Sequence, residues 1–240
     1  MSFLYHTFIS TPLYNGLIFL MDIAPWADAG VAVILFTIII KLILFPLSKK
    51  AVITQLRMKE IEPAMNRIRE TVKDRQMQAL QIMNLYKEKG VNPFSGILNI
   101  IIQLPILIAL YSIFIKSGLP VVNTELLYPF VAVPTVDMEF LGILNIAEKS
   151  IILSVIAAAA QYFQIRYSLP PTPPAKKNPS FQDDLARNVN MQMRYVFPVV
   201  ILFISYTASA TVALYLIVSS LFTIGQELYI RKKLGMSKEK

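Results

Sequence analysis

The sequence of 240 residues contains no cysteine and only one histidine. Disulfides, thiolate metal sites, cysteine nucleophiles and a lipidated N-terminal cysteine are therefore excluded, and a zinc site has almost no ligands available. Charged residues are also scarce, at 16%, where soluble domains average about one quarter. Hydrophobic residues make up 55% of the chain, and the mean hydropathy is +0.55. This composition predicts a lipid-embedded protein.

The motifs of common enzyme classes are missing as well. The sequence has no GxSxG, no glycine-rich phosphate loop, and no acid pair or His–Glu set within its apolar segments. A proton relay across a membrane would need carboxylates or histidine inside the spans. We therefore predict that the protein is not an enzyme and uses no catalytic residue, metal or cofactor.

Five apolar segments are long enough, or nearly so, to cross a bilayer, which takes about 20 residues. The stretch before them is apolar but frequently interrupted, which is typical of a helix lying in the membrane interface. The sequence thus predicts an all-α polytopic membrane protein. The five predicted spans are residues 30–48, 94–116, 149–166, 195–208 and 211–230. An N-terminal interfacial segment (1–29) precedes them, and a basic tail (231–240) follows them. The predicted connections are a cytoplasmic helical hairpin (49–93), an extracytoplasmic loop (117–148) and a proline-rich cytoplasmic loop (167–194).

The basic residues predict an orientation. Twenty of the 23 lysines and arginines lie in residues 49–89, 166–194 and 231–240, whereas residues 117–148 contain four acids and no basic residue. Basic loops stay on the cytoplasmic side of a membrane. We therefore expect the N-terminus outside the cell and the hairpin, the proline-rich loop and the C-terminus in the cytoplasm.

Lys41 lies inside the first span, where a cation costs about 2.5–3.5 kcal/mol. Two explanations remain open. Its side chain can snorkel toward the end of the span, about 9 Å away at 1.5 Å per residue, or it can face a hydrated interior. Polar residues at helical spacing on other spans favour the interior, although ordinary interhelical hydrogen bonds would explain the serines and threonines alone.

We predict a substrate groove lined by polar residues from three spans. Glu227, near the end of the last span, is the single carboxylate that the sequence offers as a partner for the cation. The predicted groove residues are Lys41, Thr37, Asn99, Gln103, Tyr215, Ser219 and Thr223.

Three stretches resemble the YidC/Oxa/Alb family of membrane protein insertases: TIIIKLILFPLSKK (37–50), YKEKGVNPFSGILNIIIQLPILIALY (86–111) and FPVVILFISYTASATVALYLIVSSLFTIGQ (197–226). The resemblance is to the bacterial YidC-like short form without a large periplasmic domain, and it covers nearly the whole chain. The most specific signature comprises Asn92, Pro93, Gly96, Gln103, Pro105, Ile106, Ala109, Leu110 and Tyr111.

The resemblance implies a five-helix core around a hydrophilic groove that is open to the cytoplasm and to lipid. Lys41 matches a groove cation that is usually arginine in the family, and Ala208-Ser209-Ala210 replaces a Pro-Ser-Gly-like turn. The implied function is insertion and folding of newly synthesised membrane proteins in the bacterial plasma membrane. The implied partners are nascent membrane proteins and the lipid bilayer, with the ribosome, the Sec translocon and a targeting receptor as candidates for the hairpin at 49–93.

Two other classes of function compete with this interpretation. A non-inserting membrane chaperone or a targeting-receptor subunit would use the same surfaces to hold a client. A small-solute transporter is disfavoured because the five spans contain no inverted repeat and no carboxylate deep within the membrane.

Overall fold

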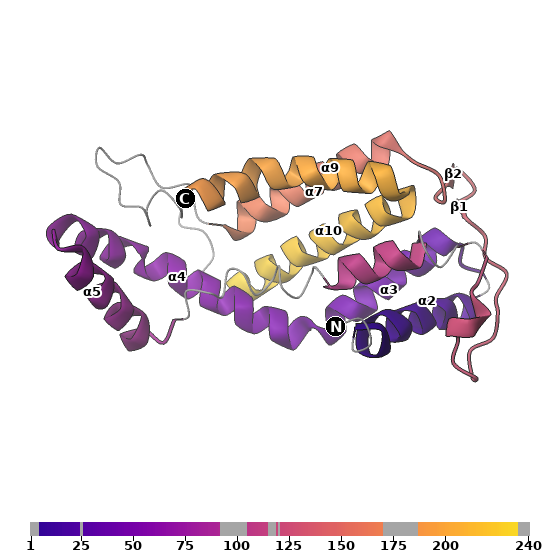
Figure 1. The fold of residues 1–240 in the computed structure, drawn as a ribbon, viewed down its shortest axis with the longest axis horizontal. Helices are drawn as coiled ribbons and strands as arrows, with labels where there is room; N and C mark the ends of the chain where they lie inside the picture. The colour runs from indigo at the N-terminus through magenta and orange to yellow at the C-terminus, as the bar shows by residue number, and fades with distance from the viewer. Residues whose placement is uncertain are drawn as a thin grey trace. The chain divides into compact units, whose positions relative to one another are not determined.

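The computed structural model describes residues 5–24, 26–91, 105–114, 119, 121–169 and 187–234. These residues are mainly helical (Figure 1). The chain divides into two compact units. One comprises Met1–Ile43 and Gln103–Gly225, and the other comprises Leu44–Ile102 and Gln226–Lys240.

Helix α2 (Thr11–Ile23) packs against α3 (Ala29–Ile43). One face of α2 is buried, because its apolar residues recur at helical spacing. A close approach between the two helices depends on Gly16, where an added Cβ would lie 3.0 Å from Cε2 of Phe36. A π-helical turn, η1 (His6–Ser10), precedes α2 and leads into Pro12. Proline has no N–H to donate, so a wider turn before it is expected.

Helix α7 (Ile151–Ser168) packs along α9 (Phe197–Ala208) through small residues (Figure 1). Ser154, Ala157 and Ala160 of α7 are buried at intervals of three, and Ser205 of α9 is fully buried. Small side chains let helix backbones approach closely, which is the usual packing of helices in membranes. The π-helical turn η3 (Gln192–Val196) precedes α9 and, like η1, stands just before a proline, Pro198.

Two helices in the described part of the chain are long and apolar enough to cross a membrane, Arg187–Ala208 and Ala210–Lys233. The second of these is α10. A third span is possible by the same criterion if α3 and the helix that follows Leu44 are counted together. The helix Pro105–Phe114 is apolar but shorter. Large apolar side chains on α7 and α9 are exposed, which suits lipid and would be unfavourable in water.

Residues 121–148, the connecting segment, contain a 3₁₀ turn, η2 (Thr124–Leu126), and the strands β1 (Glu139–Phe140) and β2 (Leu144–Asn145). The strands pair in antiparallel fashion, with Phe140 opposite Leu144. The segment caps two helices with its main chain. The carbonyl of Asp137 accepts a hydrogen bond from Ala29 N at 2.8 Å, and the carbonyl of Glu148 accepts one from Ala210 N at 2.7 Å. First-turn N–H groups of α3 and α10 are thereby paired.

Two buried residues of α2 fix the other end of the connecting segment. Asn15 donates to the carbonyl of Leu126 at 2.8 Å and accepts from Tyr128 N at 2.6 Å. The hydroxyl of Tyr14 accepts from Asn123 N at 2.8 Å, and burial raises the pKa of this phenol. The segment is therefore held at both ends by polar groups that are shielded from water.

In the second unit, α4 (Phe45–Thr71) and α5 (Arg75–Glu88) form a helical hairpin. Asp74 caps α5 by accepting from Gln76 N at 2.8 Å. Ile61, Met65 and Val91 form a small buried cluster between the arms, and Tyr86 packs against it. No residue of α5 is buried. Another small cluster joins α4 to the last turns of α10, through Val52, Leu56 and Ile230.

Candidate functional site

Lys41 contacts α10 in the structure. Its ammonium donates a hydrogen bond to Oγ1 of Thr223 at 3.1 Å, and that hydroxyl donates in turn to the carbonyl of Ser219 at 2.8 Å. Its neighbours Leu42 and Ile43 are exposed apolar residues. A cation on an apolar helix thus has a polar partner on a second helix, which reduces the cost of removing it from bulk water.

Three other predicted groove residues lie on the same two helices. Thr37 lies one turn before Lys41 on α3, is buried, and donates to the carbonyl of Val33 at 2.7 Å. Tyr215 and Ser219 lie at four-residue spacing before Thr223 on α10, and both are buried. The structure thus describes five of the seven predicted residues, on two helices, and places Lys41 and Thr223 in contact. Asn99 and Gln103 lie outside the described residues.

One polar contact between helices was not among the predicted site residues. The hydroxyl of Ser220 on α10 donates to Oε1 of Gln161 on α7 at 3.1 Å. Ser220 lies next to Ser219 but on an adjacent face of α10, so the helix offers hydroxyl groups in two directions. The pair Ser219-Ser220 in the sequence is a signal that could have suggested this, because consecutive residues on a helix point about 100° apart.

Glu227, the candidate carboxylate partner of Lys41, belongs to the second unit. It is buried and forms an ion pair with Arg231 one turn later, with Nε of Arg231 3.1 Å from Oε1. Glu–Arg pairs at this spacing stabilise a helix. Arg231, Lys232 and Lys233 also lie in the last turn of α10, where positive charge is favoured by the helix dipole.

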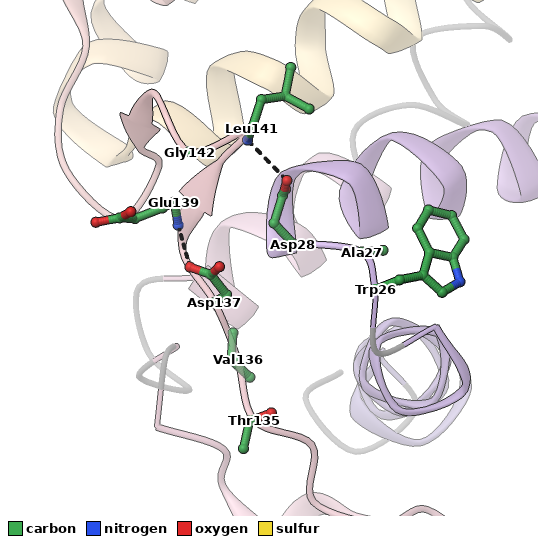
Figure 2. Close-up of a pocket in the computed structure, with 9 residues that line it drawn as sticks. All are labelled: Trp26, Ala27, Asp28, Thr135, Val136, Asp137, Glu139, Leu141 and Gly142. Carbon is green, nitrogen blue, oxygen red and sulfur yellow. Dashed lines mark hydrogen bonds between the residues drawn. The ribbon is translucent and has the colours of Figure 1, made fainter.

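The structure also contains a pocket of about 380 Å³, where the connecting segment meets the start of α3 (Figure 2). Three carboxylates line it, but two of them act as caps. Asp28 accepts hydrogen bonds from Val31 N at 2.9 Å and Leu141 N at 3.0 Å, and Asp137 accepts from Glu139 N at 2.9 Å. Within the described residues, no group of three metal-ligating side chains could hold an ion. Asp28 and Asp137 therefore hold the local backbone in place.

Long apolar helices with exposed apolar faces, joined by polar contacts between their spans, define a polytopic helical membrane protein. Comparison with known families makes the assignment specific. The model of the family described as 60Kd inner membrane protein matches residues 20–238. The chain belongs to this family, and both the all-α polytopic fold class and the resemblance to YidC/Oxa/Alb proteins are confirmed.

Individual relatives agree with the family match. The chain is 32% identical over 228 residues to a protein of Clostridium tetani named Membrane protein insertase YidC, covering 95% of this chain and 88% of that protein. A Fusobacterium nucleatum protein of the same name is 31% identical, covering 85% of this chain and 86% of its own length. A third, from Oleidesulfovibrio alaskensis, is 30% identical over 95% of this chain, but only 39% of its own length is matched.

Proposed function

We propose that this protein inserts newly made membrane proteins into the bilayer and assists their folding, using Lys41 as the cation of a hydrated groove. The observation that carries the proposal is the hydrogen bond between Lys41 on α3 and Thr223 on α10. This bond places the Lys41 ammonium against α10, the helix that carries the hydroxyl groups of Tyr215, Ser219 and Thr223 at four-residue spacing. The names of the relatives from C. tetani and F. nucleatum support the same function.

The groove would lower the cost of moving a polar segment partway across the membrane. A short polar or acidic stretch of the client, attracted by Lys41, would enter among Thr37, Tyr215, Ser219 and Thr223. Asn99 and Gln103 complete the proposed lining. A charge moved into hydrocarbon alone would meet a penalty of several kcal/mol, whereas a site with water and hydroxyl groups solvates it.

The apolar segment of the client would move along lipid-facing helices. Val199, Val200 and Phe203 of α9 are exposed, and so is Ile108 of the helix Pro105–Phe114. These apolar surfaces suit a client that leaves the protein sideways. Transfer of about 20 apolar residues into hydrocarbon then drives the reaction, so that no nucleotide or redox cofactor is needed.

The proposed location is the bacterial plasma membrane, with the N-terminus outside and the C-terminus in the cytoplasm. In that orientation the α4–α5 hairpin lies in the cytoplasm, where clients arrive. Its ten lysines and arginines between residues 49 and 89 suit an acidic or nucleic-acid partner. The ribosome, the Sec translocon and a targeting receptor are the proposed partners of this hairpin.

The test is insertion into liposomes that contain the purified protein. A small client with an acidic external segment is added, and protease protection reports the fraction inserted. We expect Lys41→Ala to lower the initial rate about tenfold, which corresponds to about 1.4 kcal/mol of lost stabilisation, and Lys41→Arg to keep most of it. Lys149→Ala is the matched control, since this lysine is exposed and its Nζ lies 5.9 Å from the centroid of the Tyr206 ring.

Unchanged insertion by Lys41→Ala for every client tested would contradict the role of the groove cation. The same assay separates insertion from chaperoning alone. A protein that only holds its clients would bind them, as crosslinking from positions on α9 would report, but would leave them sensitive to protease.

A further inference from the structure

The tip of the β1–β2 hairpin exposes apolar side chains in a strained turn. Leu141 and Ile143 are 62% and 85% exposed. The N–H of Ile143 donates to the carbonyl of Phe140 at 3.1 Å, which closes the turn. Both residues between them have positive φ, +53° for Leu141 and +65° for Gly142. Glycine adopts this conformation freely, but a leucine in it costs about 1–2 kcal/mol.

A tight hairpin turn in water usually has asparagine, aspartate or glycine at such a position, because these residues tolerate positive φ. Here the strained position carries a large apolar side chain, and Figure 2 shows that side chain extending away from the Asp28 carboxylate. The turn is nevertheless fixed, since Leu141 N donates to Asp28 at 3.0 Å. Leucine at this position is explained if its side chain has an apolar environment.

The hairpin is attached where membrane helices begin. Asp28, the residue that Leu141 contacts, caps the first turn of α3 through Val31 N at 2.9 Å. The ring of Phe140 covers Gly30, where an added Cβ would lie only 2.2 Å from Cδ2 of Phe140. On the other side, the carbonyl of Ile146 accepts from Thr211 N at 3.1 Å, in the first turn of α10. A membrane helix starts near the boundary between water and lipid, so the hairpin lies at that depth.

Other exposed apolar residues lie near the starts of α3 and α7. Trp26, two residues before the cap of α3, is 77% exposed, and tryptophan is enriched at membrane interfaces. Ile151 and Ile152, in the first turn of α7, are exposed as well. These isoleucines begin a helix whose exposed side is apolar as far as Phe163. Exposed apolar side chains thus occur at the hairpin tip and near the starts of two helices, as a membrane protein presents them to lipid.

We propose that the β1–β2 hairpin is a membrane-interface anchor. Leu141 and Ile143 insert among the headgroups and upper acyl chains of the leaflet in which α3 and α10 begin. Glu139 and Asn145, which pair across the strands, are exposed and polar, and they remain on the watery side. Through Asp28, the anchor is coupled to the start of the helix that carries Lys41.

The absence of cysteine makes a direct test practical. Ile143→Cys, labelled with an environment-sensitive fluorophore, is reconstituted into phosphatidylcholine–phosphatidylglycerol liposomes. Nitroxide-bearing lipids then report depth, and iodide reports exposure to water. Ile152→Cys is the lipid-facing reference, and Thr135→Cys, an exposed position of the same segment, is the aqueous control. We expect position 143 to be quenched by headgroup-level nitroxides and shielded from iodide, as position 152 is, with position 135 showing the opposite.

An attached fluorophore could itself enter lipid, so a second variant uses the protein's own chemistry. Ile143→Trp in a Trp26→Phe background has a single tryptophan. Blue-shifted emission that brominated lipids quench would support the anchor. Emission typical of water, together with iodide access equal to that of position 135, would overturn it. Shielding from iodide without quenching by lipid probes would also overturn it, because a protein surface would then cover the tip.

Discussion

The connecting segment and the α4–α5 hairpin both join apolar helices, but different interactions hold them. The connecting segment is fixed by buried hydrogen bonds from Asn15 and Tyr14 at one end and by caps on α3 and α10 at the other. The α4–α5 hairpin is held by one small cluster around Met65 and by hydrogen bonds from Gln78 to the carbonyls of Arg69 and Val72, and α5 buries no residue. Buried hydrogen bonds thus hold the connecting segment, whereas the α4–α5 hairpin buries few apolar side chains.

This difference has energetic consequences. A hydrogen bond in a shielded environment is strong, and its loss leaves an unpaired polar group, so the connecting segment should be rigid and sensitive to single substitutions. Elements with few buried contacts open at low free energy. The α4–α5 hairpin should therefore open locally without unfolding the first unit. That behaviour suits a surface that receives varied clients, as proposed above.

Asn15→Ala should give the largest loss of stability. Asn15 is 2% exposed, and its removal leaves the carbonyl of Leu126 and the N–H of Tyr128 without this partner. We expect about 3 kcal/mol, measured by thermal unfolding in detergent. Asn145→Ala is the matched control, because exposed Asn145 makes only local side-chain hydrogen bonds, accepting from Ala147 N and donating to Glu148 Oε1, and its loss should cost less than about 1 kcal/mol. Equal losses of stability in the two variants would contradict the role of Asn15 in holding the connecting segment.

Gly30→Ala should have the next largest effect. Its Cβ would lie 2.2 Å from the Phe140 ring, so the ring must leave α3, at a cost of about 2 kcal/mol. Phe140→Ala added to Gly30→Ala should relieve the clash, and a double-mutant cycle in unfolding free energy measures the coupling. Gly225→Ala is the control, since nothing lies within 4 Å of its added Cβ, and it should be neutral or stabilising. Additive effects at Gly30 and Phe140 would be inconsistent with this packing.

Asp74→Ala should cost about 1 kcal/mol, because it removes the N-cap of α5. The effect should be confined to the α4–α5 hairpin. Hydrogen exchange should accelerate in α5 and stay unchanged in the connecting segment. Asp74→Asn keeps an acceptor for Gln76 N and should retain most of the protection. Faster exchange in both regions would mean that the two do not open independently.

Tyr86 should give the smallest effect, and one that depends on pH. Burial raises its pKa above the ordinary value of 10.0, and the Arg69 charge opposes that shift in part. Because the folded hairpin disfavours the phenolate, its stability is complete below about pH 10 and declines as the pH rises through the folded-state pKa. Hydrogen exchange of α5 across alkaline pH checks this, and Tyr86→Phe should remove the dependence. The same pH dependence in Tyr86→Phe would assign it to another group.

The sequence predicted the fold class and family because those signals are local. Long apolar runs, helical spacing around Lys41 and the signature from Asn92 to Tyr111 can each be recognised without knowing what they contact. The contact of Lys41 with Thr223 was also within reach, since each residue belongs to a polar series at four-residue spacing on an apolar helix.

Other features depend on contacts between distant residues. In the sequence, Asn15 is one of several polar interruptions in an apolar stretch. Its partners at Leu126 and Tyr128 show that it holds the connecting segment. The sequence did not predict the β1–β2 hairpin, for a similar reason. Its strands have two residues each and a leucine in the turn, so neither alternation nor turn chemistry predicts it.

The caps on α3 and α10 have a consequence for sequence variation. Their acceptors are the main-chain carbonyls of Asp137, Ile146 and Glu148, which every amino acid possesses. Side chains at these three positions can therefore drift among relatives without loss of the caps. The number of residues between them cannot, because one insertion would displace a carbonyl from its helix. We expect relatives to be divergent in composition here and uniform in length, the reverse of an ordinary surface loop.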